Sequence, residues 1–113
     1  MEMIVHLDED VFEMVKNGKK NIEVRINDEK RRKLKIGDKL IFLKRPNDDE
    51  IIETKVISLD YYDNFEELVK HYDMSDLYLE TYSKADFVKE LERFYTLDEQ
   101  KEYGVVAIGF IKE

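Results

Sequence analysis

The sequence predicts an α+β fold, in which short helices flank a mixed β-sheet or small β-barrel that the terminal strand closes. Three observations lead to this prediction. Apolar and polar residues alternate in the first half, helix-capping pairs gather in the second half, and the last segment is uniformly apolar. At 113 residues the chain is long enough for one hydrophobic core, so we expect a single domain over residues 1–113.

The first elements follow from short-range patterns. Residues 3–6 (MIVH) alternate weakly and are expected to form a strand. Residues 7–18 are expected to form a helix, because Asp8 is a suitable N-cap residue and Gly18 can end the helix. Residues 20–26 (KNIEVRI) then alternate with a period of two, which predicts a strand with one apolar and one polar face.

The middle of the chain predicts two further strands. Residues 27–38 are polar and are expected to form a connection with one helical turn, which ends at a Gly-Asp turn. Residues 39–45 (KLIFLKR) form the next predicted strand. The only proline, Pro46, begins a polar loop, so we expect a hairpin that leads into a long strand over residues 51–62.

The second half predicts three short helices and a final strand. The helices are expected within residues 64–72, 83–95 and 96–104, because each segment opens with a helix-capping pair. The pairs are Asn64 with Glu67, Ser83 with Asp86, and Thr96 with Glu99. Residues 104–113 (GVVAIGFIKE) are too uniformly apolar for an exposed strand, so we expect a central strand that is covered on both faces.

Composition limits the functional classes. The chain has no cysteine and only two isolated histidines, so we expect no disulfide, thiolate site, metal or cofactor. No apolar stretch has membrane-spanning length, and the first residues do not resemble a signal peptide. We therefore expect a cytoplasmic protein with no membrane partner.

The chain has one basic segment. From Lys16 to Arg45 there are 12 basic and four acidic side chains, whereas the whole chain has a net charge of −8. The overall charge argues against a general attraction to nucleic acid, but this segment provides a local one. Such a segment is equally typical of lysines that only solvate a surface, and both interpretations stay open at this point.

Three charged residues in this segment form a candidate site. Glu23 and Arg25 are two apart on a predicted strand, so they share a face about 7 Å apart and can form an ion pair. On an open surface such a pair contributes roughly 0–1 kcal/mol. In a cavity, the guanidinium would instead be oriented for a phosphate, a carboxylate or a nucleobase edge. Lys20 would add a positive charge at the mouth.

The same stretch resembles a known family. GKKNIEVR fits the pattern G-x-K-x-x-E-x-R through Gly18, Lys20, Glu23 and Arg25, and is followed by ND, by KR at residues 30–31, and by IGDKLIF. This order resembles the ASCH domain, the activating signal cointegrator homology family, in its small bacterial single-domain form. YTLDEQKEYGVVAIGF resembles the closing segment of those members, so the similarity spans essentially the whole chain.

The resemblance implies a PUA-like β-barrel and a cleft that binds RNA or a nucleotide-like ligand. The residues expected at this cleft are Lys20, Glu23 and Arg25, flanked by Asp28, Arg31 and Tyr103. Arg25 and Lys20 would hold an anionic group, and Glu23 would accept a hydrogen bond from a base amine or orient Arg25. The other tyrosines are expected to be mainly packing residues.

Two alternatives remain open. One branch of the family resembles an amidohydrolase of acylated cytidine nucleosides that uses a lysine, a threonine and a glutamate. Its lysine would match Lys20, but Glu23 occupies the position of its threonine. A hydrolase of a modified nucleoside would therefore need Glu23 as a general base and Lys20 to stabilise an oxyanion. The second alternative is a protein-binding module that uses the acidic helices.

Overall fold

The computed structural model describes residues 1–113 and contains five strands and six helices. The strands are β1 (Glu2–Leu7), β2 (Ile22–Ile26), β3 (Lys39–Lys44), β4 (Ile51–Tyr62) and β5 (Val105–Lys112). The helices are α1 (Glu9–Lys16), α2 (Glu29–Arg32), α3 (Phe65–Val69), α4 (Met74–Leu77), α5 (Lys84–Glu92) and α6 (Leu97–Tyr103). The α+β class is confirmed, and only the short α4 was not predicted.

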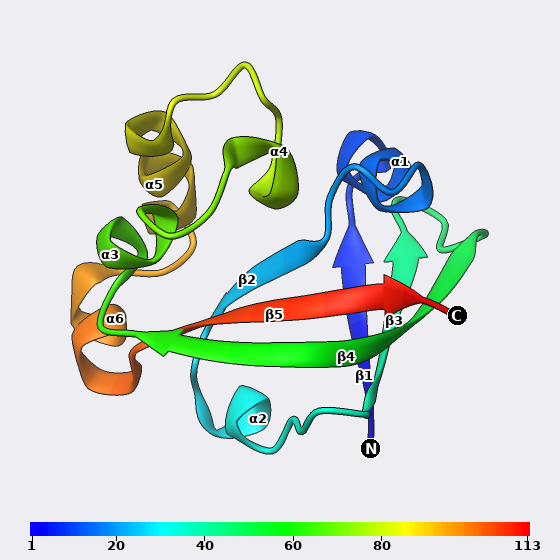
Figure 1. Ribbon diagram of the computed structural model, residues 1–113, viewed down its shortest axis with the longest axis horizontal. Coiled ribbons are helices and arrows are strands. Elements are labelled where there is room, and N and C mark those ends of the chain that lie inside the picture. Colours follow the sequence, from blue (N-terminus) through cyan, green and yellow to red (C-terminus); the bar gives the residue numbers. More distant parts are fainter.

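The five strands form one mixed sheet that curls into a half-barrel (Figure 1). The strand order is β1-β3-β4-β5-β2, in which β1 runs parallel to β3 and all other neighbours are antiparallel. The terminal strand β5 joins β4 to β2. It does not close the barrel, because β1 and β2 remain the two edges of the sheet.

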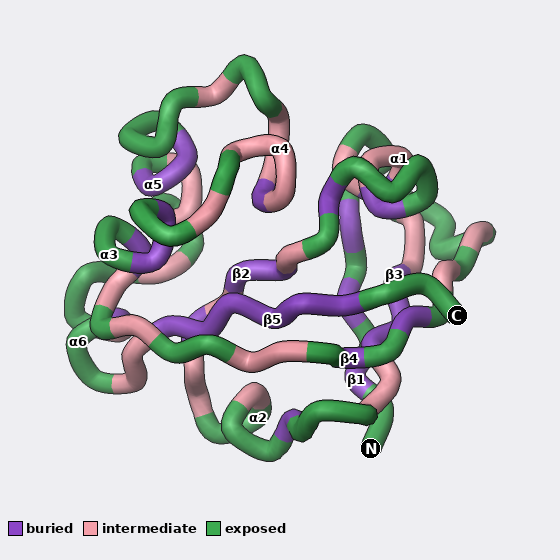
Figure 2. The backbone as a smooth tube through the Cα atoms, in the orientation of Figure 1, coloured by how far each residue is buried: buried purple, intermediate pink, exposed green.

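Strand β5 separates two hydrophobic cores. Val106, Ile108 and Phe110 contribute to one core with α1, β1 and β3, whereas Val105 and Ala107 contribute to the other with α3, α4 and α5. Residues alternate sides along a strand, so the apolar run of β5 fills both cores. Figure 2 shows this strand buried along most of its length. The expected central strand with two covered faces is confirmed.

The expected capping pairs begin three of the helices. The side chains of Asn64, Ser83 and Thr96 each accept a hydrogen bond from the backbone N–H three residues later. At α6, the Glu99 carboxylate also accepts a hydrogen bond from the backbone N–H of Thr96, which completes a capping box. Asp8 occupies the N-cap position of α1 as expected, but its side chain makes no capping hydrogen bond.

A glycine determines how the chain leaves α1 and reaches β2. Gly18 has a φ of +76°, in the left-handed region that favours glycine. The chain folds back beyond it, and the backbone N–H of Lys20 donates to the carbonyl of Met14 at 3.1 Å. This return places Lys20 beneath the surface at the start of β2.

No helix of the protein has the length and apolar composition needed to cross a membrane.

Candidate functional site

Lys20, Glu23 and Arg25 lie together on the wall of a cavity of about 500 Å³. The cavity opens between the two edges of the half-barrel, because it is also lined by His6 and Leu7 from the end of β1. Helices α4 and α5 complete its wall. Its volume lies within the range of small-molecule sites, roughly 300–1,000 Å³.

Glu23 is the centre of a buried ion cluster. It is only 6% exposed, and its Oε1 lies 3.7 Å from Lys20 Nζ while its Oε2 lies 3.3 Å from Arg25 Nη2. The backbone N–H of Val24 also donates to Oε1 at 3.0 Å. Burial raises the pKa of Glu23, but the two cations and the Val24 N–H outweigh it, so the net pKa is lowered. Glu23 is therefore charged at neutral pH.

The structure corrects the expected position of Lys20. Sequence analysis placed it at the mouth of the site, whereas its side chain is only 3% exposed. Its Nζ donates to the backbone carbonyls of Ile22 and Leu77, the latter at 2.6 Å, and so connects the start of β2 to α4. Burial lowers the pKa of Lys20, against the opposing effect of Glu23. Lys20 thus balances charge and fixes β2.

Arg25 is the member of the cluster with donors left for a ligand. Its Nη2 donates to Glu23 and its Nη1 to the hydroxyl of Tyr95 at 3.4 Å, but its buried Nε has no partner. The nearby Glu23 carboxylate raises the pKa of Arg25. Two cations against one carboxylate leave the cluster with a net positive charge. The Arg25 guanidinium therefore offers a local site for an anionic or electron-rich group, although Asp8, Arg45 and Glu90 also line the cavity and bring the formal charge of its lining to zero.

The cavity also has an aromatic wall that sequence analysis did not assign to the site. It consists of Tyr78, Phe87, Phe94 and Tyr95. Tyr78 stacks on Phe87 with ring centroids 5.4 Å apart, so the expected packing role of Tyr78 is confirmed, although its ring also faces the cavity. Phe94 is 72% exposed. Phe87 lies in α5 and is buried, whereas Phe94 follows the end of that helix, so their spacing in the sequence does not indicate a shared site.

The three flanking residues expected from the sequence do not line this cavity. Asp28 caps α2, where its carboxylate accepts from the backbone N–H of Arg31 and forms an ion pair with the Arg31 guanidinium at 3.2 Å. Tyr103 lines a second cavity, and the Arg32 guanidinium lies 5.8 Å from its ring centroid. For Asp28 and Arg31 the reason is local, because α2 begins soon after β2 and turns the chain away, whereas Tyr103 ends α6.

The buried cluster predicts a specific acid sensitivity. The folded-state pKa of Glu23 lies below its ordinary value of 4.5, so its ionised form stabilises the protein above that pH. This contribution is lost as the pH falls from about 4.5 through the lower folded-state pKa. We expect the difference in unfolding free energy between the parent and Glu23→Gln to be constant near neutral pH and to shrink below pH 4.5. Urea denaturation at a series of pH values measures it, and a difference that grows on acidification would contradict this assignment.

Comparison with known proteins agrees with this architecture. The family model described as ASCH domain matches residues 5–113. The sequence of hypothetical protein PH0355, which has a crystal structure, is 33% identical to that of this chain. The two structures match with a TM-score of 0.84, over 100% of both chains. The solution NMR structure of PF0455 from Pyrococcus furiosus is 31% identical, with a TM-score of 0.79, covering 99% of this chain and 97% of that one.

No curated protein matches the chain. No group of three or more histidine, aspartate or glutamate side chains is placed to hold a metal ion. The family match spans nearly all of the chain, and the curled five-stranded sheet with six helices is consistent with a PUA-like ASCH fold. The expected family and fold are confirmed: the protein belongs to the ASCH domain family.

Proposed function

We propose that the protein binds RNA or a nucleotide-like ligand in the cavity lined by Lys20, Glu23 and Arg25. The observation that carries this proposal is the Arg25 guanidinium, which faces a cavity of about 500 Å³ and keeps a buried Nε without a partner. A buried donor of this kind is normally satisfied by a partner or a ligand. ASCH domains are often considered to bind RNA, and membership of the family supports the same reading.

The arrangement gives each residue a distinct role. Arg25 binds the anionic phosphate or the acceptor edge of a base, because a guanidinium can make two parallel hydrogen bonds. Glu23 orients Arg25, and Lys20 supplies the buried counter-charge that keeps Glu23 ionised. The rings of Phe94 and Tyr95 offer faces on which a base can stack.

The hydrolase alternative has less support from the same contacts. A general base needs a free lone pair and a pKa near the working pH. Glu23 has a lowered pKa, and both of its oxygens already accept hydrogen bonds. Lys20 Nζ is committed to two backbone carbonyls, so it has little capacity to stabilise an oxyanion. We therefore advance binding, not hydrolysis.

A thermal-shift screen of nucleosides, nucleotides and short RNAs tests the proposal. A ligand at 100 times its dissociation constant stabilises the folded state by about 2.7 kcal/mol, which raises the melting temperature. We expect nucleotides to stabilise more than the matching nucleosides, because only nucleotides carry phosphate. Affinity for a short RNA should fall as salt is added, since bound phosphates release counterions. Absence of any shift, or RNA affinity that does not respond to salt, would overturn the proposal.

A further inference from the structure

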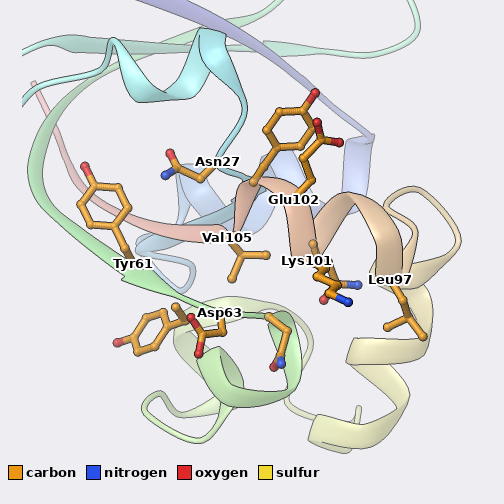
Figure 3. Close-up of a pocket in the computed structure, with 12 residues that line it drawn as sticks. Asn27, Tyr61, Asp63, Leu97, Lys101, Glu102 and Val105 are labelled. Carbon is orange, nitrogen blue, oxygen red and sulfur yellow. The ribbon is translucent and has the colours of Figure 1, made fainter.

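A second cavity, of about 680 Å³, lies just beyond the end of β2. Its wall combines the end of β4, the start of β5 and the face of α6, and Figure 3 shows these segments around the opening. Its lining includes Asn27, Tyr61, Tyr62, Leu97, Lys101 and Tyr103. It shares no residue with the first cavity. The described ion cluster therefore does not account for it.

Asn27 lines this cavity, and its side chain has no hydrogen-bond partner within the protein. Its backbone is fully used, because the N–H donates to the carbonyl of Gly104 at 2.9 Å and the carbonyl accepts from Arg32 Nε at 2.9 Å. Its carboxamide makes no hydrogen bond within the protein, and the Oδ1 atom is buried without a partner. A carboxamide presents a donor and an acceptor together, which is the pair that asparagine offers to adenine.

Tyr61 provides a stacking surface on the wall of the same cavity. This residue is 56% exposed, although it lies near the end of β4, a strand in the middle of the sheet. Figure 3 shows Asn27 and Tyr61 on one side of the opening and Leu97 and Lys101 on the other, with Val105 between them. Base stacking on a tyrosine ring combined with hydrogen bonding to the base edge is the usual way that proteins bind single-stranded RNA.

Charge indicates which part of a nucleotide this cavity suits. Its wall carries Asp63, Lys101 and Glu102, a net negative set that does not attract phosphate. The adjoining segment over residues 30–35 (KRRKLK) is strongly basic, and Arg32 connects it to the cavity by donating to the carbonyl of Tyr103 at 3.3 Å. A neutral base would therefore occupy the cavity, while its phosphates lie over α2.

The two cavities are neighbours along the chain and in space. Arg25 at the first and Asn27 at the second are two residues apart, about 7 Å for extended backbone. Phe94, in the short link after α5, lines the first cavity, and Leu97, the first residue of α6, lines the second; they are 72% and 67% exposed. An extended ligand could thus pass from one cavity to the other along the edge strand β2.

We infer that the second cavity binds a further base of the same single-stranded RNA, with adenine preferred through Asn27. This inference rests on the proposed function of the first cavity. The inference also accounts for the three flanking residues that sequence analysis expected at the binding cleft. Tyr103 lines the second cavity, Arg31 belongs to the basic helix α2, and Asp28 caps that helix, which contacts the cavity wall through Arg32 and Tyr103.

Binding of two probes by the full-length protein tests the inference: a mononucleotide, AMP, and a short oligoadenylate. We expect Asn27→Ala and Tyr61→Ala each to weaken oligoadenylate binding about tenfold and to leave AMP binding unchanged. Asn27→Ala should also reduce the preference for oligoadenylate over oligouridylate, which a general loss of folding would not do. Asn47→Ala, in the exposed loop between β3 and β4, is the matched control and should change neither probe.

The outcomes separate this inference from the proposed function. If AMP binds the parent protein and Asn27→Ala and Tyr61→Ala leave oligoadenylate affinity unchanged, the second cavity is not a base site. If neither probe binds the parent protein, the inference fails, whereas the proposed function fails only if the screen of nucleosides, nucleotides and short RNAs also finds no ligand. Melting curves of both variants check folding, and we expect both to fold because neither side chain makes a hydrogen bond within the protein.

Discussion

Replacing Glu23 with glutamine is expected to lower the free energy of unfolding by about 3–5 kcal/mol, as removal of one member of a buried ion pair usually does. The change keeps the size of the side chain but removes its charge. Lys20 and Arg25 would then remain in the wall of the cavity without their counter-charge, at 3.7 and 3.3 Å from the substituted group. Urea or thermal denaturation at neutral pH measures the loss.

Two comparisons make this result specific to the buried cluster. Glu67→Gln removes a carboxylate that pairs with Lys70 at 2.8 Å on the exposed surface, and it should change stability little. The double variant Lys20→Met with Glu23→Gln should be less destabilised than the two single changes added together, because each single change leaves the other charge unpaired. Additive losses, or equal effects at Glu23 and Glu67, would show that the cluster is not coupled.

Replacing Arg25 with methionine is expected to weaken binding of a nucleotide at least 30-fold, which corresponds to about 2 kcal/mol or more. Methionine fills a similar volume but provides neither the charge nor the donors. Isothermal titration of a ligand identified by the screen measures the change, at a temperature where melting curves show the variant to be folded.

Two further variants define what Arg25 contributes. Arg25→Lys should recover little affinity, because an ammonium cannot present two parallel donors or hold Glu23 and a ligand in one plane. Arg93→Met removes an exposed arginine that pairs with Glu90 and does not line the cavity, so it should leave binding unchanged. Equal losses at Arg25 and Arg93 would indicate a diffuse electrostatic attraction and would contradict a site at the cavity.

The open side of the half-barrel explains why this site can exist. Strands β1 and β2 are the edges of the sheet, and backbone pairing between them would fill the space that the cavity occupies. Instead, α4 and α5 cover the gap with side chains. Lys20 stabilises this arrangement, because it donates to carbonyls of both β2 and α4. The same contacts thus support the fold and orient Arg25.

Local patterns in the sequence determined most of the fold. The period of two in residues 22–26 placed Glu23 and Arg25 on one face of a strand and Val24 on the other. In the structure Glu23 and Arg25 form an ion pair and Val24 contributes to a hydrophobic core, although all three border the cavity. The capping pairs located three helices, and the apolar run over residues 105–110 identified the strand that divides two cores. These features depend on residues close in sequence, so composition and spacing are sufficient to predict them.

Only the tertiary structure determines which residues surround the polar face of β2. Burial of Lys20 depends on the carbonyl of Leu77, and the contact of Arg25 depends on Tyr95, both more than 50 residues away in the chain. Likewise, Tyr103 ends α6 just before Val105, which pairs with Ile26 at the end of β2 remote from Lys20, so Tyr103 lines the second cavity. A strand pattern specifies which side chains share a face, but not which helices lie opposite. That is set by long-range packing, which local spacing does not encode.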